Sequence, residues 1–166
     1  MTTRNKTIIV KDLEAKCIEV SREFEASLEN VWRAYTESEL LDQWWGPSPW
    51  RAETKKMNFR EGGHWLYAMV GPDDQKQWGK MEYIRINKYE RIEVTDAFCN
   101  EEGIEDPSLP KSKGSFEFTE TPHGVLVTSR MYYPSEKDVQ TLVDMGFEQG
   151  ISTALDQLEE VLDAQL

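Results

Sequence analysis

The C-terminal segment carries the long helical pattern that most constrains how this chain can fold. Across residues 136–166, apolar side chains recur at helical spacing and form a single stripe, at positions 139, 142, 143, 147, 151, 154, 155, 158, 161 and 162. One amphipathic helix cannot bury such a stripe by itself. Because the middle of the chain has a strand-like pattern, we expect this helix to lie on the concave face of a sheet.

The segments before this helix are strand-like or short and helical, and turn-forming residues separate them. They predict one strand, two short helices and then a run of about six further strands. Consecutive strands that are joined by turns form antiparallel pairs. The expected fold class is therefore α+β, a curved antiparallel sheet of about six to seven strands wrapped around the long C-terminal helix. The predicted strands are residues 17–24, 50–59, 64–70, 78–86, 92–98, 114–119 and 125–133.

Two short helices are predicted after the first strand. Ser27 is a suitable N-cap for the first helix, because a serine hydroxyl accepts a hydrogen bond from a free backbone N–H of the first turn, and Ser38 is the corresponding residue for the second. A Trp-Trp-Gly-Pro sequence at residues 44–47 ends the second helix, since proline cannot continue a helix. Neighbouring helical positions point about 100° apart, so one indole can fill the core while the other faces a groove or a cavity wall.

Two glycines, Gly146 and Gly150, lie on or beside the apolar stripe of the C-terminal helix. Glycine in the interior of a helix costs about 1 kcal/mol relative to alanine, so both positions require a compensating reason. Close approach to the sheet is one such reason, and room for a ligand is another. The helical pattern does not decide between them.

Length and charge restrict the organisation and the partners of the chain. Its 166 residues suit one domain, which we place at residues 16–166. Residues 1–15 form an extension that is either a frayed, flexible leader or a short added strand. The formal net charge of -12 repels phosphate backbones and anionic lipid headgroups, so we expect no nucleic-acid partner. We expect no membrane insertion either, because no apolar run approaches the roughly 20 residues that a bilayer span needs.

Residues that often carry chemistry are sparse. Cys17 and Cys99 have no metal-like spacing, and without a secretory leader we interpret them as reduced thiols in a cytoplasmic protein. His64 and His123 have no neighbours at metal-ligand spacing. The motifs of serine hydrolases, nucleotide-binding loops and zinc peptidases are absent, and we expect no cofactor.

Arg22 and Asp96 are the candidate polar anchors of the interior, since each is in phase with the apolar residues of its own strand. A buried guanidinium needs a carboxylate or a ligand anion, which makes Asp96 a candidate partner for Arg22. The alternative is an arginine in solvent or paired at the rim of the sheet. Tyr67, Tyr83 and Glu82 are further candidates for acid–base chemistry, but their spacing singles out no pair.

Several motifs resemble those of one known family. They are Arg22-Glu23-Phe24-Glu25-Ala26, Val31-Trp32-Arg33-Ala34-Tyr35-Thr36, Trp44-Trp45-Gly46-Pro47, Phe59-Arg60-Glu61-Gly62-Gly63-His64-Trp65, Gly79, Phe116-Glu117-Phe118 and Met145-Gly146-Phe147-Glu148-Gln149-Gly150. With the order of elements, over about residues 17–164, they resemble the family named for homology to the activator of the heat-shock-protein-90 ATPase. That family lies within the START-like helix-grip superfamily, beside polyketide cyclases and birch-pollen-allergen-like proteins. Two positions depart from its pattern: Ser27 replaces a usual proline, and Ile151 a common aromatic residue.

The resemblance implies a curved sheet that grips the C-terminal helix, with an apolar cavity between them. Members of the superfamily use such cavities for lipids, sterols, polyketides and other apolar ligands, whereas the eukaryotic namesake binds a chaperone through its surface. We therefore expect this chain to bind a mostly apolar small molecule or lipid. The alternatives are a chaperone-linked protein-interaction module and an enzyme of the cyclase or dehydratase kind.

Aromatic and methionine side chains dominate the candidate ligand cavity. Aromatic side chains bury about 150–250 Å² each and suit a packed core equally well, and methionine fills irregular gaps in either setting. A hollow and a filled interior therefore both remain open. The candidate cavity residues are Trp44, Trp45, Trp65, Tyr67, Met69, Trp78, Met81, Phe116, Phe118, Met131, Met145 and Gln149.

Overall fold

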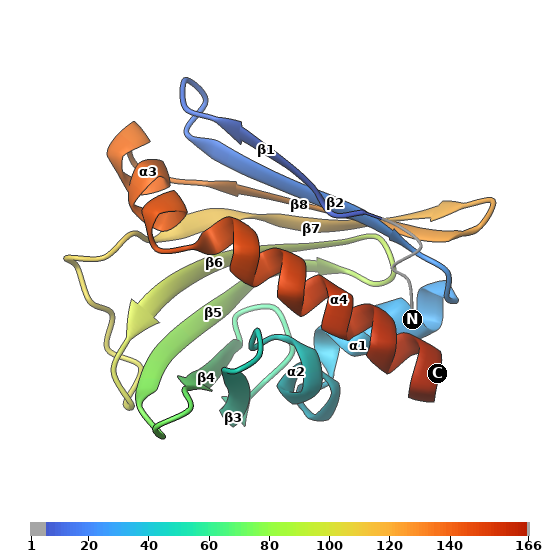
Figure 1. The fold of residues 1–166 in the computed structure, drawn as a ribbon, viewed down its shortest axis with the longest axis horizontal. Helices are drawn as coiled ribbons and strands as arrows, with labels where there is room; N and C mark the ends of the chain where they lie inside the picture. Colours follow the sequence, from blue (N-terminus) through green and yellow to red (C-terminus); the bar gives the residue numbers. More distant parts are fainter. Residues whose placement is uncertain (1–5, 166) are drawn as a thin grey trace.

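The computed structural model describes residues 6–165, which form one open antiparallel sheet of eight strands and four helices (Figure 1). The strand order is β1-β2-β8-β7-β6-β5-β4-β3. Helix α4 runs across the concave face of the sheet. The strands are β1 (Ile8–Asp12), β2 (Cys17–Phe24), β3 (Arg51–Met57), β4 (His64–Val70), β5 (Lys76–Asn87), β6 (Arg91–Cys99), β7 (Ser112–Thr121) and β8 (Gly124–Tyr132). The helices are α1 (Leu28–Thr36), α2 (Ser38–Trp44), α3 (Glu136–Asp144) and α4 (Phe147–Gln165).

The expected α+β helix-grip architecture is confirmed, with one strand more than the sequence predicts. The added strand is β1, which pairs antiparallel with β2 from Ile8 opposite Ser21 to Asp12 opposite Cys17. The N-terminal extension thus contributes an edge strand, one of the two alternatives considered for it. Residues 1–5 of the extension lie outside the described part of the chain.

The two short helices begin in different ways. Ser27 caps α1 as expected, because its Oγ accepts a hydrogen bond of 3.1 Å from the backbone N–H of Asn30. The corresponding prediction for Ser38 is wrong. Ser38 is the first residue inside α2, and Glu37 occupies the cap position without a side-chain hydrogen bond. Both helices pack their apolar residues into the core under the sheet.

The predicted uninterrupted helix over residues 136–166 is also wrong, because α3 and α4 are separate helices. Gly146 between them has a φ of +87°, a left-handed conformation that glycine adopts without the steric cost of a Cβ. The N–H of Met145 bonds to the carbonyl of Thr141 at 3.0 Å, and the N–H of Gly146 to that of Val143 at 3.1 Å. These bonds close the last turn of α3. The apolar stripe continues across the break, so the stripe alone does not reveal it.

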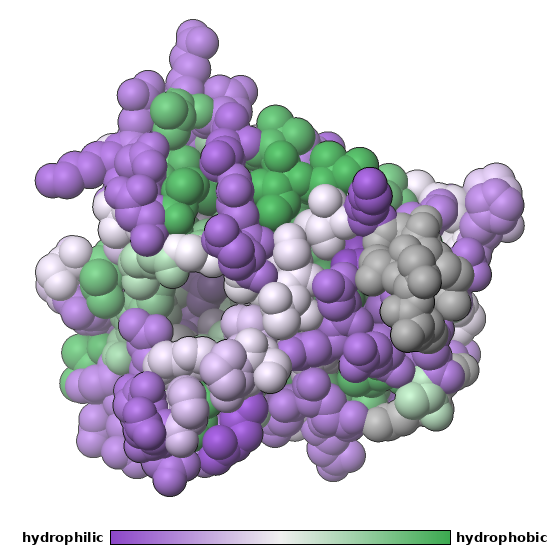
Figure 2. Space-filling view, viewed as in Figure 1, coloured by the Kyte–Doolittle hydropathy of each residue, from purple (hydrophilic) through white to green (hydrophobic). Residues whose placement is uncertain are grey.

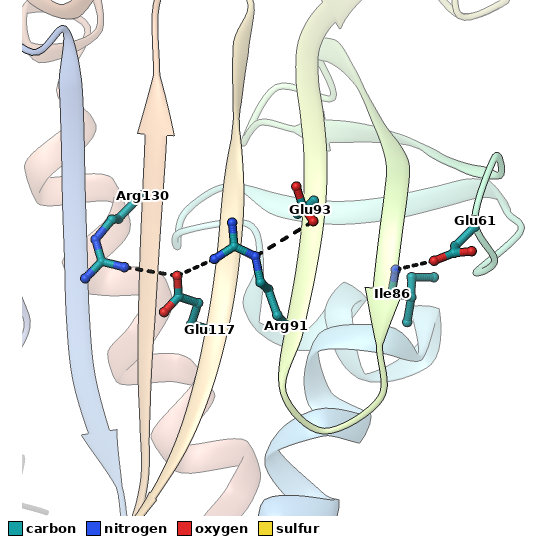
Figure 3. Close-up of polar contacts among 6 residues, drawn as sticks. All are labelled: Glu61, Ile86, Arg91, Glu93, Glu117 and Arg130. Atoms are coloured by element: carbon teal, nitrogen blue, oxygen red, sulfur yellow. Dashed lines mark hydrogen bonds and ion pairs between the residues drawn. The ribbon is translucent and has the colours of Figure 1, made fainter.

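The face of the sheet opposite α4 carries a chain of ion pairs (Figure 3). Arg130 on β8 and Arg91 on β6 both contact Oε1 of Glu117 on β7, at 3.0 and 2.6 Å. Arg91 also lies 3.9 Å from Glu93, and Arg130 lies 3.0 Å from Glu19 on β2. Because these side chains are 32–41% exposed, each pair contributes only about 0.2–1 kcal/mol. The convex face is therefore a polar outer surface, and the interior lies on the other side.

Candidate functional site

A cavity of about 490 Å³ lies between the sheet and the junction of α3 with α4. Strands β4, β5 and β6 form one wall, the loop between α2 and β3 forms a second, and the α3–α4 junction forms a third. Figure 2 shows the hollow on the face that α4 crosses. This volume is within the range of about 300–1,000 Å³ that is typical of small-molecule sites. The interior is therefore hollow at this end of the fold.

The adjacent tryptophans at the end of α2 divide between the core and the cavity. Trp44 is fully buried, and its indole N–H donates a hydrogen bond to the carbonyl of Ala34 at 2.9 Å. Trp45 lines the cavity and packs edge-on against Trp44, with ring centroids 5.4 Å apart. The amide of Gln157 on α4 donates hydrogen bonds to the carbonyls of Trp44 and Gly46, at 3.1 and 2.8 Å. Helix α4 thereby holds this wall in position.

Tyr67 on β4 is part of the sheet wall of the cavity. Its ring stacks on that of Trp65, with centroids 4.2 Å apart. Gly79 on β5 lies directly opposite Tyr67 in the register. A Cβ at residue 79 would lie 2.8 Å from Cζ and Oη of Tyr67, closer than such atoms approach in proteins. The missing side chain at Gly79 therefore gives the Tyr67 ring its place in the cavity wall.

Gly150 and Ile151 on α4 complete the cavity. A Cβ at residue 150 would meet only Cγ of Pro47, at an ordinary contact distance of 3.7 Å. Close approach to the sheet therefore does not require glycine at this position, and room for a ligand is the remaining reason considered. Ile151 stands where the resemblance leads us to expect an aromatic residue. Its smaller side chain leaves more of the cavity open than a ring would.

Asp96 on β6 is the one charged side chain that lines the cavity within residues 6–165. Burial raises the pKa of its carboxyl to about 7, and a hydrogen bond from the backbone N–H of Ala97 opposes this shift. Desolvation disfavours the ionised form of a carboxyl, whereas hydrogen bonds to the carboxylate favour it. The Asp96 carboxyl therefore titrates near neutral pH.

Three tyrosines interact with the charge of Asp96. Burial is the largest cause of the raised pKa values of Tyr67, Tyr83 and Tyr133, and the Asp96 carboxylate raises all three further. A hydrogen bond with Ser112 opposes the shift of the Tyr133 pKa. Tyr67 and Tyr133 line the cavity, while the Tyr83 hydroxyl is buried without a hydrogen-bond partner. These neutral phenols can both donate and accept hydrogen bonds.

The structure brings some of the predicted cavity residues together in the lining. These are Trp45, Tyr67, Met69, Trp78 and Met145. The Trp78 ring also lies 5.8 Å from the ammonium groups of two lysines at residues 55 and 76. Part of its surface therefore faces cations outside the cavity.

The other predicted cavity residues lie outside the lining. Most of them are buried in the solid part of the core, where packing between rings consumes their surface. Phe116 and Trp44 border a separate void of about 30 Å³, and Gln149 is exposed on α4. The residues that do not line the cavity are Trp44, Trp65, Met81, Phe116, Phe118, Met131 and Gln149.

Arg22 points inward as its strand phase predicts, but its partners are not Asp96. The side chain is buried, with Nη1 2.6 Å from Asp156 and Nη2 3.3 Å from Glu159, both on α4. Nη1 also donates a hydrogen bond of 3.1 Å to the hydroxyl of Thr7. The proposed pairing of Arg22 with Asp96 is therefore wrong. Arg22 ties α4 to β2, and Asp96 faces the cavity alone.

Several residues of the lining were missed by the sequence analysis. Phe98 is in phase with Asp96 on β6, so strand alternation was a sufficient signal for it. Leu142 and Phe147 belong to the apolar stripe, which was assigned only to helix packing. Trp50 and Tyr133 are the end residues of the predicted strands 50–59 and 125–133, but they lie just outside β3 and β8, so strand alternation does not set the direction of their side chains.

The remaining candidates offer little further chemistry. Glu82 accepts a hydrogen bond of 3.3 Å from Thr95 and is not part of the lining. Burial raises the pKa values of the free Cys17 and Cys99 thiols, which favours their unreactive protonated forms. In the described part of the chain, no cluster of His, Cys, Asp and Glu could hold a metal ion, and no helix could span a membrane. The cytoplasmic location stays a prediction.

Comparison with known proteins gives a family match and close structural neighbours. Residues 25–163 match the family model of activator of Hsp90 ATPase homolog 1-like proteins. Protein Ms6760 from Mycobacterium smegmatis is 29% identical, with a TM-score of 0.87 over 96% of this chain and 98% of that chain. A protein from Arthrobacter aurescens is 29% identical, with a TM-score of 0.88 over 94% and 91% of the two chains. A protein from Staphylococcus epidermidis is 32% identical, with a TM-score of 0.83 over 95% and 94%. No curated protein matches the chain significantly.

Proposed function

Because the chain belongs to the family of activator of Hsp90 ATPase homolog 1-like proteins, we propose that it uses the helix-grip interior to bind a mostly apolar small molecule or lipid. The observation that carries this proposal is the cavity of about 490 Å³ between the sheet and the α3–α4 junction. Its lining is mainly aromatic and aliphatic, with a few polar groups such as Asp96 and Tyr67, which is the usual composition of small-molecule sites.

Amide chemical shifts in NMR spectra test this function. Isotope-labelled protein is titrated with fatty acids, sterols and aromatic polyketides, one compound at a time. We expect at least one class to give saturable shifts in β4, β5 and β6 and in residues 142–154, because these segments surround the cavity. A panel in which no compound gives a saturable response contradicts the proposal.

Two substitutions at Gly150 connect the binding to the cavity. Gly150→Leu places a branched side chain at a position that lines the cavity. Gly150→Ala adds only a Cβ, which has room beside Cγ of Pro47. We expect the leucine variant to lose binding and the alanine variant to retain it, with both variants folded. Equal binding by the two variants would locate the ligand elsewhere on the molecule.

A chaperone-linked interaction is the second candidate function. The family name supports it, since it describes an activator of the Hsp90 ATPase. On the edge strand β1, Ile8 is 59% exposed and Val10 is 49% exposed, which offers apolar surface for a protein contact. The test is the ATPase rate of a purified Hsp90-class chaperone with and without this chain. An increase in the rate supports this candidate, and an unchanged rate contradicts it.

A further inference from the structure

Two ionisable side chains in the interior, Arg22 and Asp96, have very different surroundings. Arg22 contacts two carboxylates on α4, those of Asp156 and Glu159. Asp96 forms no ion pair among residues 6–165, and no lysine, arginine or histidine of this region lines the cavity that it faces. Charges that are taken out of water need a partner, because desolvation is costly. The chain supplies carboxylates for Arg22, whereas no cationic side chain of the described residues lines the cavity that Asp96 faces, so a ligand that enters the cavity can supply the cation.

We propose that the cavity selects ligands that carry a cationic amine, with the carboxylate of Asp96 as the partner of the ammonium group. This inference rests on the proposed small-molecule function and names the ligand class of the same site. An aryl or alkyl body would occupy the apolar part of the cavity, and the amine would lie against β6.

The other polar and aromatic groups of the lining suit an ammonium. A primary ammonium has three N–H donors. One can bond to Asp96, and the hydroxyl oxygens of Tyr67 and Tyr133 are acceptors in the same cavity. Trp45 and Trp50 add aromatic rings, whose faces attract cations. Positive charge is therefore favoured by both the ionised and the neutral groups of the lining.

Other head groups fit this lining less well. A ligand carboxylate, such as that of a fatty acid, would meet Asp96 in a cavity that no lysine, arginine or histidine of the described residues lines. A neutral alcohol could donate a hydrogen bond to the Asp96 carboxylate or to the tyrosines, but it brings no positive charge to compensate the desolvated carboxylate. The net charge of -12 also attracts cations to the molecule and repels anions. The order of affinity that follows is amine, then alcohol, then carboxylate.

The affinity for an amine should depend on pH in the same way as the ionised fraction of Asp96. The titratable groups that face it are Tyr67, Tyr83, Tyr133 and Cys99, and the raised pKa values of all four keep them neutral between pH 6 and pH 8. The α3–α4 wall adds no titratable side chain. With the Asp96 pKa at about 7, the ionised fraction, and with it the affinity for an amine, rises about tenfold over this pH range.

A matched set of three probes tests the inference by titration calorimetry. The probes are 2-(2-naphthyl)ethylamine, 2-(2-naphthyl)ethanol and 2-naphthylacetate, which share the aromatic body and differ in the head group. At pH 8 we expect the amine to bind at least about tenfold more tightly than the alcohol, and the carboxylate to bind most weakly. Between pH 6 and pH 8 the affinity for the amine should rise about tenfold, and the affinity for the alcohol should not rise.

Two variants with the same change in net charge complete the test. Asp96→Asn should remove the preference for the amine while the alcohol still binds, whereas Asp73→Asn, in an exposed turn, should leave the preference unchanged. An alcohol that binds the wild type as tightly as the amine overturns this inference and leaves the cavity function standing. If none of the three probes binds while a compound of the NMR panel does, the inference is overturned and the cavity function stands. If neither the probes nor the panel bind, both are overturned.

Discussion

Asp96 makes the free energy of unfolding depend on pH in the direction opposite to that of most carboxylates. Its pKa in the folded chain is about 7, above the ordinary value of 3.8. The folded state therefore holds a proton that the unfolded state has already released between these two pH values. Stability falls as pH rises through this window and levels off above it, because a largely desolvated carboxylate must then be kept without a cation beside it.

Replacement of Asp96 by asparagine should remove this pH dependence. The amide has a similar shape and no charge to desolvate, so we expect Asp96→Asn to be more stable than the wild type by about 1–3 kcal/mol at pH 8. The gap should widen from pH 4 to pH 7 and stay constant above pH 7. Urea denaturation at pH 4, 6 and 8 measures it. A gap of the same size at all three pH values would show that Asp96 is not desolvated.

Arg22 should behave as a structural ion-pair residue. Arg22→Met leaves Glu159, which is only 4% exposed, without its cation, and we expect a loss of about 3–5 kcal/mol in the free energy of unfolding. The double variant Arg22→Met/Glu159→Leu should recover most of this loss, because both charges are then gone. Chemical denaturation of the two variants provides the measurement. A single variant within about 1 kcal/mol of the wild type contradicts this role.

The contrast between Arg22 and Asp96 shows how far strand phase predicts a polar site. Alternation along β2 and β6 correctly indicated that both side chains point inward. It could not indicate their partners, because Asp156 lies 134 positions from Arg22 along the chain. Which residue of α4 meets β2 depends on how the helix crosses the sheet, and no local pattern encodes that crossing.

At the scale of elements, replacing Gly146 and Gly150 by alanine should change the free energy of unfolding in opposite directions. Gly146 has a φ of +87°, where an L-residue costs roughly 1–2 kcal/mol, so Gly146→Ala should lower the free energy of unfolding by about that amount. Gly150 lies inside α4, and there Gly150→Ala should raise stability by up to about 1 kcal/mol. Parallel urea denaturation of both variants tests the pair. A change of the same sign in both would contradict the break at Gly146.

The elements themselves were largely predictable from the sequence, and the exceptions have physical causes. The strands after α2 have local signals, namely alternating side chains and turn residues between them. The break at Gly146 was hidden because α3 and α4 share one apolar stripe. Ser38 was misplaced because Glu37, without a side-chain cap, occupies the position before α2. β1 was left open because only a short apolar patch marks it and its place depends on the edge of β2.

At the scale of the whole molecule, the cavity is the space that side chains from several segments, distant in the sequence, leave between them. Trp45, Tyr67 and Ile151 come from a loop, a strand and a helix, and each would suit a packed core as well. The sequence could therefore predict the aromatic composition of the interior but not its emptiness. Trp50 and Tyr133 were predicted as strand residues but lie just beyond the ends of β3 and β8, so their direction depends on the assembled fold.

Salt should act in opposite directions on the stability of the whole molecule and on its affinity for an amine. The chain has 31 acidic and 19 basic residues, and this surplus of negative charge repels itself in the compact state. The exposed ion pairs around Glu117 contribute only about 0.2–1 kcal/mol each, too little to reverse the effect of the surplus. Screening by salt, with a Debye length near 10 Å at 0.1 M, should therefore raise the melting temperature between 20 and 300 mM NaCl. The same screening should weaken binding of 2-(2-naphthyl)ethylamine and leave binding of the matched alcohol unchanged. A melting temperature that falls with added salt would instead show that the ion pairs outweigh the net charge.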